Sequence, residues 1–138
     1  MESIVVVKKA ALDYFRKKAR DSQFEIHAYI LGEYVHPDKF LISSIEHARE
    51  YEIQTKDCVQ PTGEEFSRVK SLAEKQGKRI IGDLHSHPQW DAVMSPQDHK
   101  AALEDGLQIC GIVSTMKRRT RVRFWLVNSA LPCEIKYV

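Results

Sequence analysis

Hydrophobic residues recur along the chain in helical and strand-like spacings, separated by glycine, proline and polar turns. In residues 10–20 the apolar side chains fall on one face of a helix, among lysines and arginines. Residues 62–76 predict a second helix, with Thr62 as its N-cap and Glu65 completing a capping box before the stop at Gly77. Each helix would therefore have one apolar side to pack against a sheet.

Strands are predicted wherever short apolar runs are bounded by turn residues. The segment from Phe24 to Leu31 is mostly apolar and is closed by Gly32. The further expected strands are residues 40–45, 51–53, 79–84, 107–114, 121–128 and 133–138. Residues 51–53 are expected either to continue the strand at residues 40–45 or to pair with it. Helices that alternate with strands predict an α/β or α+β sandwich built around one sheet.

Composition describes an ordinary globular chain. Its 138 residues favour a single domain, residues 1–138, and 43% hydrophobic with 29% charged residues is typical of such proteins. The net charge of +2 is too small to indicate nucleic-acid binding by itself. Three cysteines without metal-ligand spacing suit a reducing compartment. With no run of about 18 apolar residues and no signal-peptide pattern at the N-terminus, we expect no membrane span and a cytoplasmic location.

The most informative feature is the sequence H-S-H-P at residues 85–88, followed after six residues by S-P-Q-D at residues 95–98. Because side chains alternate along a strand, His85 and His87 are expected to point to the same side at the end of the preceding strand. Asp98 falls in the first turn of a third predicted helix, which Pro at its first position favours. Two imidazoles and one carboxylate are a donor set of catalytic zinc, with water in the fourth position.

A zinc hydrolase also needs a base and a donor to the oxyanion. Glu25 is the candidate base, because a charge inside an otherwise apolar strand is costly unless it is paired or functional. Ser95, three residues before Asp98, is the candidate donor. The plainer interpretations are an edge-strand charge for Glu25 and only an N-cap for Ser95. For the whole set, the alternative is a structural zinc site, with His99 or Asp91 as the nearest residues for a fourth ligand.

These residues resemble the motif of the JAMM (MPN-plus, JAB-domain) zinc metalloproteases. The zinc ligands of that family match His85, His87 and Asp98, and its catalytic glutamate matches Glu25. The serine that helps to stabilise the tetrahedral intermediate matches Ser95. The resemblance extends over nearly the whole chain, since the order of the expected elements also fits.

The resemblance implies a cytidine-deaminase-like α/β sandwich, with a mixed sheet and about three helices, and one Zn²⁺ with a catalytic water per chain. It implies hydrolysis of the isopeptide or peptide bond at the C-terminus of a ubiquitin-like modifier or sulfur-carrier protein. The short segment after Asp98 is typical of a compact, prokaryotic-type member. Many members have two small residues soon after the catalytic glutamate, and this chain departs from them with His27-Ala28. Trp90 and Val93, between the ligands, are expected to line the substrate groove or to pack within their loop.

Other functions stay open at this point. A narrow pocket would favour a zinc hydrolase of small peptides or amides, and the same fold can serve as a non-catalytic protein-binding scaffold. The basic residues 117–123 could bind nucleic acid or an acidic partner, although a solvated hairpin turn is the simpler interpretation. Because no aromatic residues suitable for base stacking accompany these cations, nucleic-acid binding is not expected.

Overall fold

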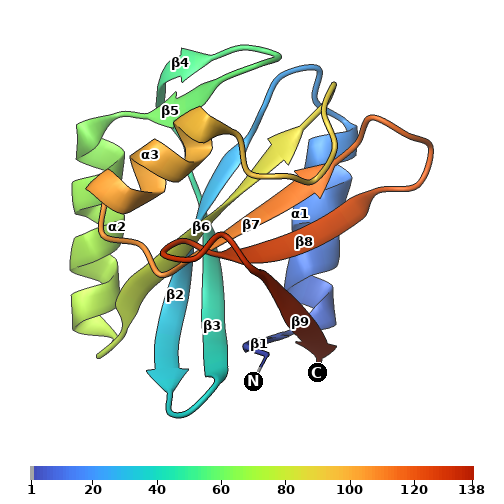
Figure 1. Ribbon diagram of the computed structural model, residues 1–138. Helices are drawn as coiled ribbons and strands as arrows, with labels where there is room; N and C mark the ends of the chain where they lie inside the picture. The colour runs from blue at the N-terminus through green and yellow to red at the C-terminus, as the bar shows by residue number, and fades with distance from the viewer. Residues whose placement is uncertain (1) are drawn as a thin grey trace.

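A mixed sheet and three helices make up the computed structural model, which describes residues 2–138 (Figure 1). The helices are α1 (Lys9–Arg20), α2 (Gly63–Lys75) and α3 (Pro96–Glu104). The strands are β1 (Ile4–Val7), β2 (His27–Val35), β3 (Lys39–His47), β4 (Tyr51–Gln54), β5 (Val59–Pro61), β6 (Arg79–His87), β7 (Ile109–Ser114), β8 (Arg121–Leu126) and β9 (Pro132–Tyr137). The expected mixed α/β class is confirmed.

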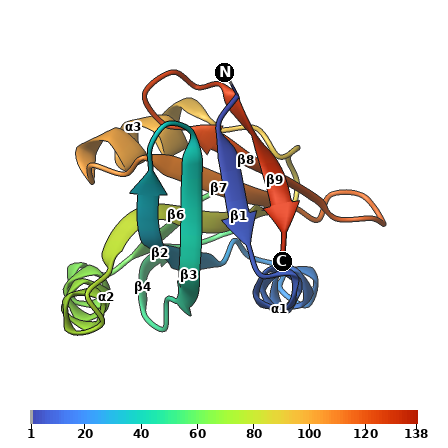
Figure 2. The same ribbon diagram turned by 90° about the horizontal axis from the view of Figure 1, so that it is seen from below.

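The main sheet closes on itself. Its strand order is β1-β3-β2-β6-β7-β8-β9, and β9 pairs in parallel with β1. The strand β6 is antiparallel to β2 on one side and parallel to β7 on the other. The strands β4 and β5 form a separate two-stranded hairpin. Seen from below, α1 and α2 lie at opposite sides of the sheet (Figure 2).

Several strand boundaries differ from the sequence-based expectation. The strand β1 was not predicted, and β4 pairs with β5 instead of continuing β3. The strand β2 begins at His27 and passes through Gly32 to Val35, so Gly32 does not close it. A Cβ on Gly32 would lie 2.0 Å from the carbonyl oxygen of Leu41, beside a shift in the β2–β3 register. This glycine therefore marks a close approach within the strand.

Apolar side chains fill the space on both faces of β6. The largest cluster lies between the sheet and α1 and includes Leu12, Phe15, Ile30, Leu84 and Phe124. A second cluster packs α3 against β7, through Ala102, Cys110 and Ile112 among others. A third packs α2 against β2, through Tyr29, Leu31, Val69 and Ala73. These layers hold β6 rigidly, and the strand ends in the buried pair His85 and His87.

The second helix has the expected N-cap, Thr62, but not the expected capping box. The Thr62 hydroxyl does accept a hydrogen bond from the Glu65 N–H, at 3.2 Å. The Glu65 carboxylate, however, does not complete a capping box; it accepts from the backbone N–H of Arg49 and from the Arg68 guanidinium. These two donors thus take the place of the Thr62 backbone N–H that a capping box would use. None of the helices in residues 2–138 has the length and apolar content needed to cross a membrane.

Candidate metal centre

Three side-chain atoms from β6 and α3 meet in one small triangle. The Nε2 atoms of His85 and His87 are 3.2 Å apart, and Oδ2 of Asp98 lies 3.2 Å from each of them. Both imidazoles are almost fully buried. As the strand alternation predicts, Ser86 points the other way, and its hydroxyl accepts a hydrogen bond from the Ile26 N–H.

The dimensions of this triangle match a zinc site. Imidazole and carboxylate ligands lie about 2.0–2.2 Å from a tetrahedral zinc ion, which places the ligand atoms roughly 3.3 Å from one another. All three separations here are 3.2 Å. With three ligands supplied by His85, His87 and Asp98, one tetrahedral position is left for water or substrate. The residues therefore fit a catalytic zinc ion.

The orientation of Asp98 comes from the start of α3. Its carboxylate accepts a hydrogen bond from the Ser95 N–H at 3.0 Å, and its own N–H donates to the Ser95 hydroxyl at 3.0 Å. This reciprocal capping box holds the carboxylate where it meets both imidazoles. Burial by itself would raise the pKa of Asp98, but the hydrogen bonds from His85 and His87 hold it well below its usual range. The carboxylate is thus ionised, as a metal ligand must be.

The other ring nitrogen is hydrogen-bonded in His87 and faces a more distant carboxylate in His85. The Nδ1 atom of His87 lies 2.8 Å from the carbonyl oxygen of Asp91, so that ring presents Nε2 to the triangle. The Nδ1 atom of His85 faces a carboxylate oxygen of Asp83 at 3.9 Å. Burial opposes protonation of His85, but the bond to Asp98 raises its pKa to about 9 in the absence of a metal ion.

Asp83 belongs to a buried polar cluster that sequence analysis missed. The oxygen of Asp83 that faces His85 also lies 3.4 Å from Nε2 of His27, and His27 is the cross-strand partner of His85. His27 has no motif context in the sequence, so nothing there marked it as a neighbour of the site. Two features indicate the cluster: His27 lies opposite His85, and Asp83 lies two residues before His85 on the same face of β6. Only the register of β2 against β6 brings them together.

Glu25 lies beside the triangle, but not inside a strand. It precedes β2, contrary to the sequence-based expectation, and only 2% of it is exposed. The β4–β5 hairpin holds its backbone: its N–H donates to the carbonyl of Thr55, and its carbonyl accepts from the Gln54 amide. The carboxylate is within 4.8 Å of the His85 and His87 nitrogens. Burial raises the pKa of Glu25 to about 7, against the opposing effect of the two imidazoles.

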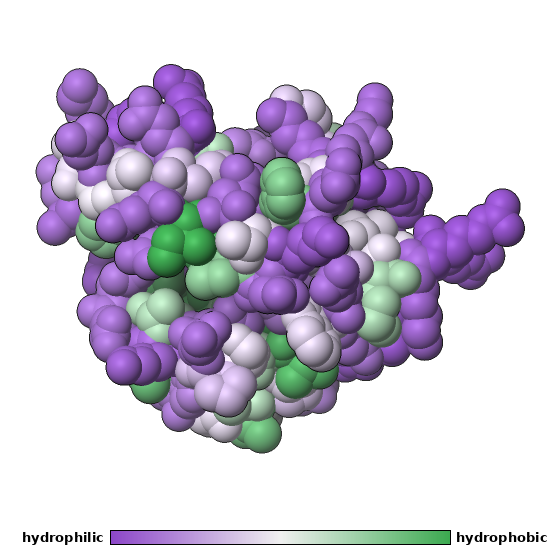
Figure 3. All heavy atoms as spheres, turned by 90° about the horizontal axis from the view of Figure 1, so that it is seen from above, coloured by the Kyte–Doolittle hydropathy of each residue, from purple (hydrophilic) through white to green (hydrophobic). Residues whose placement is uncertain are grey.

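A pocket of about 560 Å³ opens beside these groups. Its lining includes Glu25 and His87, together with Ser95, Trp90 and Val93. Trp90 and Val93 are 57% and 53% exposed, so a bound molecule could cover them. The lining residues that sequence analysis did not anticipate are Asp57, Asp91, Met94, Pro96 and Gln97. The end of the molecule seen from above is mostly hydrophilic, with small separate apolar patches (Figure 3).

The two alternative fourth ligands have other partners. The Nε2 atom of His99 lies 2.6 Å from the carbonyl oxygen of Val127, on the side of α3 away from Asp98. The side chain of Asp91 is half exposed and forms an ion pair with Arg121 at 3.6 Å. Neither side chain contributes to the triangle, so neither supplies the fourth ligand of a structural zinc site.

Comparisons with known proteins agree with this fold and motif. A family model described as "Prokaryotic homologs of the JAB domain" matches residues 8–128. The chain belongs to this family. The JAB domain family includes metalloproteases, and Glu25, His85 and His87 bring their ligand atoms close enough together to hold a metal ion. No curated protein matches the chain.

A solved structure also resembles this JAB-domain protein. The solution structure of protein DSY2949 from Desulfitobacterium hafniense superimposes with a TM-score of 0.81. The alignment covers 97% of this chain and 92% of that one, at 18% sequence identity. At that identity the likeness shows a shared fold and carries no information about activity.

Proposed function

We propose that this JAB-domain protein is a zinc-dependent peptidase that cleaves the isopeptide or peptide bond at the C-terminus of a ubiquitin-like or sulfur-carrier protein. The observation that carries the proposal is the triangle of 3.2 Å between His85, His87 and Asp98. A buried carboxylate with a pKa near neutrality lies beside it, at Glu25. A donor set for zinc next to a base suited to neutral pH favours hydrolysis over a purely structural role.

A bound zinc ion would acidify water and polarise the scissile carbonyl. Glu25 accepts the proton of the attacking water and later donates it to the leaving amine, because its carboxylate lies within 4.8 Å of the His85 and His87 nitrogens and its burial favours the protonated form. The Ser95 hydroxyl uses one lone pair to accept from the Asp98 N–H, which leaves its hydrogen free to donate to the oxyanion.

The arrangement of strands constrains how a substrate tail could bind. An extended tail could add as a strand next to the site, but β6 is already paired on both edges, by β2 and β7. The β4–β5 hairpin, which holds the backbone of Glu25, has no other partner strand in residues 2–138. We therefore assign the tail to the pocket between this hairpin and the loop that carries Trp90 and Val93.

The first test is zinc content together with cleavage. Mass spectrometry of the purified protein should find about one zinc ion per chain, and Asp98→Ala should lose it because only two ligands remain. The zinc-loaded protein should release a reporter fused to the C-terminal tail of a ubiquitin-like protein. A wild-type protein that binds no zinc after reconstitution would contradict the proposed metal centre. One zinc without cleavage of fusions or isopeptide-linked conjugates would contradict the proposed activity.

A further inference from the structure

Five cations lie together on the β7–β8 turn and the start of β8. They are Lys117, Arg118, Arg119, Arg121 and Arg123, and all five are exposed. We call these residues the basic surface. Arg121 is paired with Asp91, whereas the other four have no ion pair within the part of the chain that the structure describes. The whole chain carries a net charge of only +2, so this concentration of positive charge is local.

The strand register places the two β8 arginines of the basic surface on the same face of the sheet as the metal centre. His87 is level with Ser114 of β7, which is level with Arg121 of β8. His85 is likewise level with Ile112, and Ile112 with Arg123. Two strand spacings, roughly 10 Å, therefore separate each arginine from a metal-binding histidine. One protein domain can cover both surfaces at once.

Two contacts connect the basic surface to the pocket and hold it in place. Arg121 reaches Asp91, whose carbonyl oxygen orients His87. The turn itself is fixed to α1, because the Arg16 guanidinium donates to the Thr120 hydroxyl at 2.7 Å. The turn extends beyond the body of the molecule, on the side opposite α2 (Figures 1 and 2). The cations are thus presented to solvent from an anchored turn.

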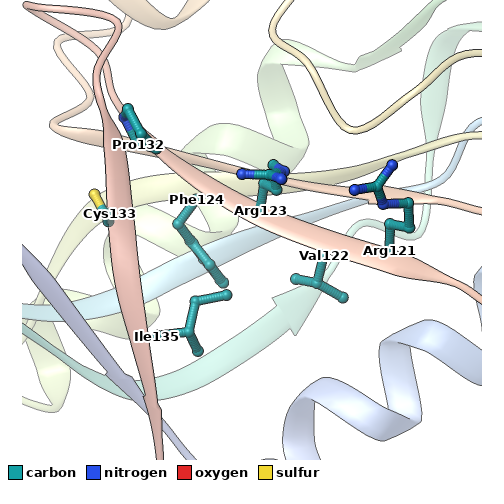
Figure 4. Close-up of a pocket in the computed structure, with 7 residues that line it drawn as sticks. All are labelled: Arg121, Val122, Arg123, Phe124, Pro132, Cys133 and Ile135. Atoms are coloured by element: carbon teal, nitrogen blue, oxygen red, sulfur yellow. The ribbon is translucent and has the colours of Figure 1, made fainter.

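A recess is lined by this part of β8 and by β9. It has a volume of about 360 Å³, and its lining includes Arg121, Arg123, Phe124 and Ile135. Figure 4 shows the two arginines on one side of β8 and Phe124 on the other, facing Ile135 of β9. The pairing of β8 with β9 is confined to its C-terminal half, so the arginine-bearing half borders this recess.

We propose that the basic surface docks an acidic face of the protein substrate while the substrate tail occupies the pocket at Glu25. The proposal rests on the peptidase function proposed above and adds the charge of the partner. Guanidinium groups bind carboxylates through paired hydrogen bonds. An acidic protein surface fits better than nucleic acid, because residues 116–123 contain no aromatic side chain for base stacking. Complementary charge near a catalytic site mainly speeds association and sets specificity.

The double variant Arg118→Glu/Arg119→Glu tests this docking. The matched control is Lys70→Glu/Lys75→Glu, which changes the net charge equally at exposed positions on α2. Two substrates are compared: an acidic ubiquitin-like domain fused through its tail to a reporter, and the tail and reporter alone. We expect the docking variant to lower kcat/KM about tenfold for the fusion, mainly through KM, and to leave the short substrate unchanged. Higher salt should reduce the wild-type rate and should affect the variant less.

Binding measured without turnover separates this inference from the proposed function. A fluorescein-labelled decapeptide rich in Glu and Asp is titrated into Glu25→Gln protein, beside a single-stranded DNA of ten nucleotides. We expect the peptide to bind, the docking variant to lose at least tenfold in affinity, and the α2 control to retain it. An equal loss for both reporter substrates, no binding of the peptide, or DNA binding tighter than peptide binding would overturn the inference.

Discussion

Ser95 and Asp98 cap each other at the start of α3, through two hydrogen bonds of 3.0 Å. One of these bonds uses the Ser95 side chain and the other uses its backbone N–H. The side-chain bond caps the helix, whereas the backbone bond holds the carboxylate oxygen that meets His85 and His87. A single local motif therefore stabilises the helix, aims a candidate metal ligand and places Ser95 at the pocket.

Replacing Ser95 with Ala separates these roles. The lost cap should reduce the free energy of unfolding by about 1 kcal/mol in the metal-free protein. The zinc affinity should change little, because the backbone N–H that holds Asp98 is retained. Turnover should fall about a hundredfold through loss of the oxyanion donor. Denaturant titration, chelator competition and kcat check these three effects, and equal losses of zinc and turnover would show that Ser95 acts only through Asp98.

Replacing Glu25 with Gln tests the base. Gln keeps the shape of the side chain but cannot take a proton at neutral pH, so kcat should fall at least a hundredfold. Zinc content should stay near one per chain, because the triangle does not include Glu25. Glu52→Gln, at an exposed position of β4, is the control and should retain full activity. Loss of zinc in Glu25→Gln would instead identify Glu25 as a ligand, since its carboxylate is within 4.8 Å of both imidazoles.

Asp83→Asn tests whether the buried cluster supports the metal centre. The Asp83 carboxylate lies 3.9 Å from Nδ1 of His85, on the side of the ring away from the triangle. We predict that it supports His85 as a metal ligand, and removing such a partner weakens metal binding about 10- to 100-fold. The dissociation constant for zinc should rise by this factor, and the visible spectrum of the Co²⁺-loaded protein should change because the His85 ligand shifts. Asp21→Asn, exposed at the end of α1, should leave both measurements unchanged. An unaltered zinc affinity in Asp83→Asn would assign the cluster to packing alone.

The ion pair of Glu65 should make stability depend on pH. The hydrogen bond from Arg68 outweighs burial and, with the Arg49 N–H, lowers the pKa of Glu65 to about 2. A carboxylate whose pKa falls on folding stabilises the protein above its unfolded value of about 4.5. That contribution is lost as the pH falls from about 4.5 to about 2. With chelator present, the difference in unfolding free energy between wild type and Glu65→Gln should shrink over this range. Glu64→Gln, at an exposed position, should show no such trend.

Features that depend on local spacing were predictable from the sequence. The alternation of side chains along a strand determined that His85 and His87 share one side. Ser95-Pro96 determined the start of α3 and thus the place of Asp98 in its first turn. The donor set of the candidate metal centre could therefore be predicted from a few residues of the sequence. The predicted start of the last strand, Cys133, is one residue from the observed start, Pro132.

Features that depend on pairing between distant segments were decided by the tertiary structure. The closure of the sheet needs β1 against β9, and neither strand carries a local signal for the other. The burial that raises the pKa of Glu25 to about 7 comes from the fold around it, with the β4–β5 hairpin holding its backbone. The register of β2, β6, β7 and β8 also aligns His27 and Arg123 with His85. Local spacing sets which side chains share a face, whereas burial and strand register arise only when the whole core packs.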